Sequence, residues 1–218
     1  MSRESDVSGQ EIANFLMEPL RTAAAESNAG RSQNLALALH TRDAIDLVAM
    51  EIYALFAKRI LGRLRSIDPG VELFDNRGEI DEPANAVGWR SSKWGRGISV
   101  CLEFDRRRLV EPYIGICAPT VQALREWEGE SGIFDPVDPA QYQAMRDAVE
   151  TGQMFDGLKN YVTPWWPCSF LLSDFMDGTS TETLLQFAGH TPYRGMTLDD
   201  WFIRDVERLY KVMLKVLG

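Results

Sequence analysis

The stretch ISVCLEFDRRRLVEPYIGIC, residues 98–117, carries the clearest indication of the fold. From Ile98 to Phe104 every second residue is apolar and the residues between are small or polar, a pattern typical of a strand with one buried face. After the polar connection Arg106-Arg107-Arg108, residues 113–117 are again extended in character. We therefore predict an antiparallel β-hairpin with one side facing a core.

Helix signals surround this hairpin. Thr41 and Asp43 start a long helix to about Arg65 that is apolar over most of its circumference. A capping box at Ser8 predicts an N-terminal helix to about Ala25. Further predicted helices start at Pro119, Asp138, Thr179 and Thr197 and end near Trp127, Glu150, Gly189 and the last residue.

These elements predict an α+β fold in which a small, mostly antiparallel sheet packs against the helix of residues 41–65 and the C-terminal helices. Residues 71–74 are a further strand candidate, followed by an acidic, turn-rich segment over residues 75–85. We expect an N-terminal helix and loop over residues 1–35 and a single α+β domain over residues 36–218.

Composition restricts the class of protein. The most apolar stretch, residues 45–64, is interrupted by Glu51, Lys58, Arg59 and Arg63, so we expect no membrane span. The start MSRESDVSGQ has no apolar signal core, and the three cysteines are odd in number and widely spaced, unlike a disulfide framework or a zinc site. A reducing, cytoplasmic setting fits best. The net charge of -9 disfavours bulk attraction to nucleic acid and favours protein partners.

No catalytic or metal-binding spacing is present in the sequence. The two histidines, His40 and His190, lie in unrelated contexts, and there is no nucleophile elbow or phosphate-binding loop. We expect no metal, no cofactor and no catalytic residue of a known pattern. Glu103 and Asp105 share one strand face and leave open a divergent, metal-dependent nuclease site. The alternative is a solvated strand face paired with arginines.

A basic, tryptophan-containing segment stands out within this acidic chain. Between residues 87 and 108, six basic residues face two acidic ones, a local charge of +4. The cations could follow a phosphate backbone while the indoles stack on bases. The alternative is that Trp89 and Trp94 cover a sheet edge. The candidate nucleic-acid-binding residues are Trp89, Arg90, Lys93, Trp94, Arg96, Arg106, Arg107 and Arg108.

A second aromatic cluster, YVTPWWP, covers residues 161–167. We interpret it as a rigid loop packed over the core. If exposed, Trp165 and Trp166 would be protein-binding anchors, because tryptophan is enriched at interface hot spots.

The long apolar helix, the tryptophan-rich approach to the hairpin, the hairpin and the WWP segment together resemble the non-catalytic C-terminal region of bacterial and prophage PD-(D/E)XK-type nuclease proteins. The resemblance covers residues 40–218. It implies an accessory or sensing domain in a phage-defence or mobile-element context. The lysine of that catalytic motif is absent, since Asp105 stands where it would be.

The leading hypothesis is therefore a non-enzymatic interaction module, an accessory or sensor subunit of a bacterial or prophage-encoded complex, with contacts from residues 89–96 or from Trp165 and Trp166. A nucleic-acid-binding protein using residues 89–108 and a divergent nuclease using Glu103 and Asp105 are the alternatives. A homo-oligomer is compatible with each of these hypotheses.

Overall fold

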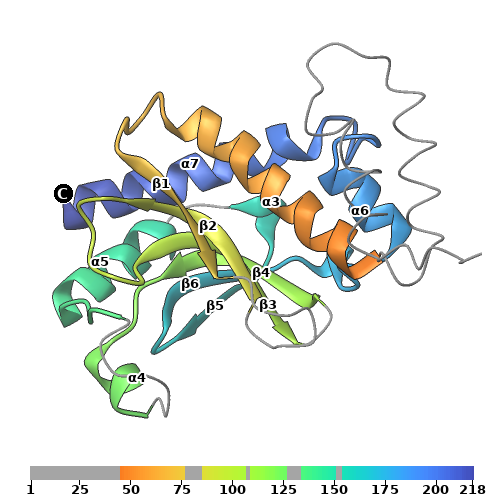
Figure 1. Cartoon of the computed structure of the whole chain (residues 1–218). Helices are drawn as coiled ribbons and strands as arrows, with labels where there is room; N and C mark the ends of the chain where they lie inside the picture. The colour runs from red at the N-terminus through yellow and green to blue at the C-terminus, as the bar shows by residue number, and fades with distance from the viewer. Residues whose placement is uncertain (1–44, 77–84, 107–108, 127–133, 151–153) are drawn as a thin grey trace, which may run out of the picture.

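The computed structural model describes residues 45–76, 85–106, 109–126, 134–150 and 154–218 (Figure 1). The predicted helix of residues 8–25 and the whole N-terminal segment 1–35 lie outside these residues. The described part is an α+β fold, as predicted.

One six-stranded sheet forms the centre of the fold, in the order β1-β2-β3-β4-β6-β5, and every neighbouring pair is antiparallel. The strands are β1 Val71–Asn76, β2 Asn85–Ser91, β3 Ser99–Arg106, β4 Val110–Cys117, β5 Asn160–Thr163 and β6 Trp166–Leu171. The predicted hairpin is the β3–β4 pair, in which Leu102 lies opposite Ile114. The alternation assigned Val100, Leu102 and Phe104 to the core, and all three are buried.

A layer of helices covers one face of the sheet (Figure 1). Helix α3 packs on β1 and β2, α7 on β3 and α5 on β6, and α6 packs beside α3 and α7. The helices are α3 Ile45–Leu64, α4 Val121–Glu126, α5 Pro139–Glu150, α6 Thr181–Phe187 and α7 Leu198–Leu217, with the short 3-10 helices η1 Phe155–Gly157 and η2 Ser173–Phe175. No described helix is long and apolar enough to cross a membrane.

Aromatic side chains join the helices beneath this layer. The Phe56 ring lies 4.9 Å from Phe187 and 5.0 Å from Phe202, both at a steep angle. Edge-to-face packing of this kind adds to the burial of apolar area. The core therefore connects α3, α6 and α7 directly, which fixes the position of the short helix α6.

The predicted helix starts at Asp138 and Thr197 are confirmed, while the start at Thr41 and Asp43 lies outside the described residues. Thr197 caps α7 by accepting a hydrogen bond from the Asp200 backbone N–H, and Asp138 caps α5 by accepting one from the Ala140 N–H. In α6 the cap is Ser180, which accepts from the Thr183 N–H, one residue later than the predicted start.

Strand β2 is a structural element that the sequence did not indicate. Residues 85–89 are all buried, so the alternation that identifies a half-exposed strand is missing. At Gly88 a Cβ atom would lie 2.4 Å from the Cβ atom of Cys101 on β3, so only glycine fits this close approach of the strands.

The expectation of a loop over residues 161–167 was wrong. Strands β5 and β6 form a hairpin there, with Thr163 paired to Trp166 across the turn. A proline and two adjacent tryptophans suggested irregular structure. The structure places Pro164 and Trp165 in the turn itself and Trp166 at the start of β6.

Candidate functional site

The two indoles of the basic segment belong to the core. Trp89 is fully buried on β2, and its Nε1 donates a hydrogen bond of 2.9 Å to the Ala57 carbonyl oxygen on α3. Trp94 is buried against Tyr210 of α7, with ring centroids 4.8 Å apart. Neither side chain can stack on a nucleic-acid base in this fold, which corrects that part of the nucleic-acid interpretation.

Several cations of this segment lie on the surface. Arg90 pairs with Glu72 at 3.2 Å and Arg96 with Asp135 at 3.0 Å, while Lys93 is exposed. Arg107 and Arg108 lie outside the described residues, as does the side chain of Arg106. Binding of nucleic acid by these cations stays a prediction. It could not include base stacking on Trp89 or Trp94, because both indoles are buried.

The carboxylates considered for a nuclease site are only partly described. Glu103 is half-buried on β3 opposite Tyr113, and the side chain of Asp105 lies outside the described residues. Among the residues that the structure describes, no group of three His, Cys, Asp or Glu side chains could hold a metal ion. The divergent nuclease site stays a prediction.

The β5–β6 turn is held firmly against the start of α4. The Ala118 N–H donates to the Trp165 carbonyl oxygen at 3.0 Å, and the Thr120 N–H donates to that of Pro164 at 2.9 Å. Trp165 also packs edge-on against Phe134, with centroids 5.3 Å apart. Trp165 and Trp166 are both half-buried, so each presents part of its ring at the surface and part to the fold.

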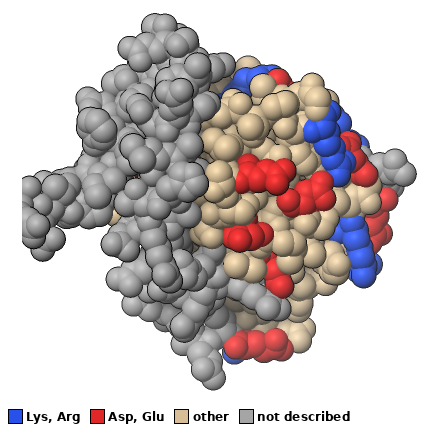
Figure 2. Space-filling view, turned by 90° about the vertical axis from the view of Figure 1, so that its right-hand side faces the viewer, with Lys and Arg blue, Asp and Glu red and all other residues tan. Residues whose placement is uncertain are grey.

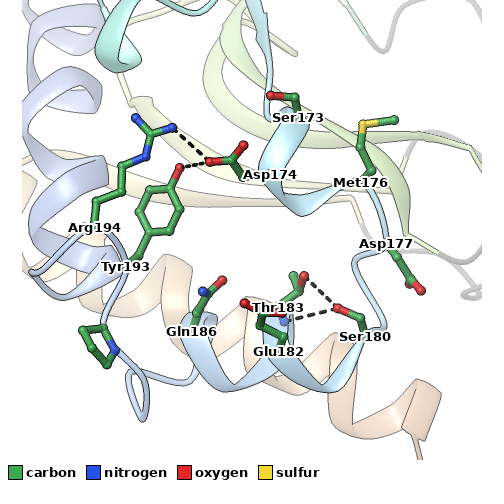
Figure 3. Close-up of a pocket in the computed structure, with 11 residues that line it drawn as sticks. Ser173, Asp174, Met176, Asp177, Ser180, Glu182, Thr183, Gln186, Tyr193 and Arg194 are labelled. Carbon is green, nitrogen blue, oxygen red and sulfur yellow. Dashed lines mark hydrogen bonds and ion pairs between the residues drawn. The ribbon is translucent and has the colours of Figure 1, made fainter.

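A pocket of about 600 Å³ opens between η2, α6 and the chain before α7 (Figure 3). We call it the α6 pocket. In Figure 3, Tyr193 and Arg194 reach toward Asp174, while Glu182, Thr183 and Gln186 lie along α6 on the other side. Its lining is mainly polar and consists of Ser173, Asp174, Met176, Asp177, Ser180, Glu182, Thr183, Gln186, Pro192, Tyr193 and Arg194.

The wall at Met176 and Asp177 is fixed by neighbouring backbone. The Gly178 N–H donates to the Leu109 carbonyl oxygen at 2.9 Å, and the Glu111 N–H donates to that of Met176 at 3.1 Å. The buried Tyr53 hydroxyl donates to the Gly178 carbonyl oxygen at 2.8 Å. A glycine is required here, because a Cβ atom would lie 2.3 Å from the Leu109 oxygen. The end of the β3–β4 hairpin thus supports the pocket.

A tight turn forms the opposite wall. Tyr193 and Met196 exchange backbone hydrogen bonds of 2.8 and 3.0 Å. The two residues between them, Arg194 and Gly195, have φ values of 50° and 82°, the left-handed pair of a type I′ turn. Arginine is uncommon at such a position, where Asn, Asp or Gly is usual, so the arginine side chain is retained at a conformational cost.

The carboxylate of Asp174 is the electrostatic centre of the pocket. The Tyr193 hydroxyl donates to its Oδ2 at 2.6 Å, and Arg194 Nη2 donates to the same oxygen at 2.9 Å. These two hydrogen bonds, the tyrosine's first, hold the pKa of Asp174 below its ordinary value. Asp174 is therefore negatively charged throughout the neutral range.

A second carboxylate, that of Asp156, binds Arg194 from outside the pocket. Asp156 Oδ2 accepts from Trp201 Nε1 at 2.6 Å and from Arg194 Nη1 at 3.0 Å. The indole hydrogen bond, followed by the arginines, lowers the pKa of Asp156. Arg194 thus shares its two terminal nitrogens between a carboxylate that lines the pocket and one that does not.

Carboxylates outnumber cations in the α6 pocket. Its lining includes one arginine, Arg194, and three carboxylates, those of Asp174, Asp177 and Glu182. Figure 2 shows the side of the molecule on which α6 lies, where acidic side chains stand in the middle of the described surface and basic ones toward an edge. Such a pocket is suited to a positively charged group that also donates hydrogen bonds.

The sequence interpretation missed this pocket. Its acids are spaced over residues 174–182 and suggest a solvated turn, and Tyr193 and Arg194 join them only through the fold. The one available signal was the Arg-Gly pair at Arg194 and Gly195, which is a hairpin-turn pattern with an unusual first residue.

Comparisons of the chain with protein-family models, with curated proteins and with solved structures found no match.

Proposed function

We propose that this chain is a non-enzymatic interaction module that binds a basic segment of a protein partner in the α6 pocket. Its setting would be cytoplasmic, as an accessory or sensor subunit of a bacterial or prophage-encoded complex. The observation that carries the proposal is the pocket itself. It has a volume of about 600 Å³, and its lining holds three carboxylates and one arginine.

The single arginine of the pocket offsets only part of the negative charge of this lining. Arg194 pairs with Asp174 at 2.9 Å and, outside the pocket, with Asp156 at 3.0 Å. A lysine or arginine side chain from a partner would enter between Asp174 on one wall and Glu182 on the other, with the Gln186 amide and the Ser180 hydroxyl as further polar contacts. Charge-assisted hydrogen bonds of this kind are stronger than neutral ones.

The charge of the whole chain supports the same partner class. At a net charge of -9, the protein attracts basic partners over distances of about a Debye length, roughly 8 Å at physiological salt. Complementary charge of this kind raises association rates and discriminates against acidic partners.

Replacing Asp174 by asparagine should weaken binding of a fluorescein-labelled Arg-Gly repeat peptide by about three- to fivefold, the effect of one partly exposed ion pair. The isosteric amide keeps the shape and removes the charge. Fluorescence anisotropy at constant ionic strength measures the affinity.

The matched control is Glu72→Gln. Glu72 is an exposed carboxylate of β1 that pairs with Arg90 and does not line the pocket. This substitution changes the net charge by the same amount, so it should leave the affinity almost unchanged. Equal weakening by both substitutions would mean that the peptide binds the acidic surface in general, and the proposal would fail.

The β5–β6 turn supplies a second candidate contact for the partner, because Trp165 and Trp166 are half-buried there and Val162, on β5, is an exposed apolar side chain. Replacing Trp165 by alanine should cost about 1 kcal/mol of stability, mainly the aromatic contact with Phe134. Urea unfolding followed by circular dichroism measures this cost.

The same variant should retain less of the partner that the wild-type chain captures from nuclease-treated host extract. If Trp165→Ala unfolds the protein, the side chain is part of the core and the turn is no partner-binding anchor.

A further inference from the structure

Building on the proposed function, we propose that Arg194 is an internal competitor for the partner's cation. It occupies an acceptor, Asp174 Oδ2, that an arginine of the partner would use, and Asp156 limits this competition by holding the other half of the guanidinium group. The occupancy of the α6 pocket is therefore regulated by an ion-pair network that lies partly outside it.

The geometry of the guanidinium group supports this division. Arg194 Nη2 lies 2.9 Å from Asp174 Oδ2, and Nη1 lies 3.0 Å from Asp156 Oδ2. The same group lies over two rings, 5.1 Å from the Tyr193 centroid and 5.9 Å from the Trp201 centroid. A planar, forked cation can bridge two carboxylates in this way, whereas an ammonium group binds as a point charge.

The position of Arg194 is imposed by its backbone. Its φ of 50° lies in the left-handed region that an arginine rarely adopts. Side chains held in sparsely populated backbone conformations are a recurring property of ligand clamps and switch regions. The fold therefore holds the Arg194 side chain at the pocket although its backbone conformation is energetically unfavourable for an arginine.

Asp156 also has a left-handed backbone conformation, and neighbouring groups hold it in place. Phe155 and Asp156 have φ values of 49° and 56°. The Phe155 N–H donates at 2.7 Å to the carboxylate of Asp205, which is fully buried on α7. Asp156 also accepts from Arg204 Nη2 at 3.0 Å. Two strained turns, residues 155–157 and 193–196, thus meet at the Asp156–Arg194 ion pair.

Electrostatics then gives the sign of each effect. A cation that approaches Asp174 is repelled by the positive charge of Arg194. Asp174 Oδ2 already accepts a hydrogen bond from Arg194, so it is a weaker acceptor for a second cation. Removing Arg194 should therefore strengthen binding of a basic ligand. Removing the Asp156 charge should release Arg194 toward Asp174 and weaken binding.

The test is a double-mutant cycle with Arg194→Gln, Asp156→Asn and the double variant, using the labelled Arg-Gly peptide and anisotropy. Arg194→Gln should bind about three- to fivefold more tightly than the wild-type chain, and Asp156→Asn should bind more weakly. In the Arg194→Gln background, Asp156→Asn should have much less effect, because Asp156 acts through Arg194.

Arg194→Gly gives a second variant if the glutamine does not fold. It removes the same charge, and glycine adopts the left-handed conformation without strain. It should also bind more tightly than the wild-type chain. Unchanged or weaker binding by both folded Arg194 variants would overturn the inference.

The outcomes separate this inference from the proposed function. If the wild-type chain binds the peptide and Asp174→Asn weakens it, but the Arg194 variants show no gain, only the competition is refuted. If the wild-type chain does not bind the peptide at all, the proposed function fails and the inference fails with it.

Discussion

Replacing Asp205 by alanine should lower the free energy of unfolding by about 3 kcal/mol, because it removes a fully buried carboxylate and the hydrogen bonds that three donors make to it. Its Oδ2 accepts from the Phe155 N–H at 2.7 Å and from Arg204 Nη2 at 2.8 Å, and its Oδ1 accepts from Arg208 at 3.0 Å. The two arginines are partly exposed and regain water, but the Phe155 N–H is left without its acceptor. Urea denaturation followed by circular dichroism measures the change.

Glu207→Ala is the control on the same helix. Glu207 pairs at 3.3 Å with Lys211, which is more than half exposed, so its loss should cost well under 1 kcal/mol. If Asp205→Ala proves no more destabilising than Glu207→Ala, then Asp205 does not fix residues 155–157, and the support behind Asp156 is absent.

Replacing Trp89 by alanine should destabilise the protein by about 4 kcal/mol. The indole is fully buried between β2 and α3, so alanine leaves a large cavity and removes the donor to the Ala57 oxygen. Thermal unfolding should show a single transition at a much lower temperature.

The conservative change Trp89→Phe separates the two contributions. It keeps most of the ring and should cost only about 1 to 2 kcal/mol, the hydrogen bond and a smaller volume loss. A Trp89→Ala variant with unchanged stability and weakened nucleic-acid binding would contradict the buried position and restore the stacking interpretation.

The part of the fold that could be predicted is the part in which residue types alternate along a strand or in which a cap residue marks a helix start. The β3 residues from Val100 to Phe104 alternate between core and the other side of the sheet, so the β3–β4 hairpin is visible in the sequence. Cap residues such as Thr197 mark helix starts through a local hydrogen bond, which needs no tertiary context.

Strand β2 could not be predicted in the same way. Ala86, Gly88 and Trp89 are all buried, and the pattern that identifies strands is lost when both faces are covered. The adjacent cations left two interpretations open, a nucleic-acid-binding segment and tryptophans that cover a sheet edge. The fold places the indoles of Trp89 and Trp94 inside and leaves Arg90 and Lys93 toward the surface.

The α6 pocket depends on tertiary structure for a different reason. Asp174, Glu182 and Arg194 come from a 3-10 helix, an α-helix and a turn that follows α6. Each residue alone is an ordinary surface residue. Only the packing of α6 against α3 and α7, and the anchoring of Gly178 by Tyr53, brings the three segments around one opening.

Binding of a basic segment in the α6 pocket can be tested by a two-dimensional ¹H–¹⁵N NMR titration of the protein with a short Arg-Gly peptide, with a Glu-Gly peptide as the control ligand. We expect saturable shift changes for the Arg-Gly peptide at the backbone amides of Asp174, Thr183, Glu182 and Arg194, and none for the control. Shift changes that do not saturate, or that spread over acidic residues far from the α6 pocket, would contradict this expectation.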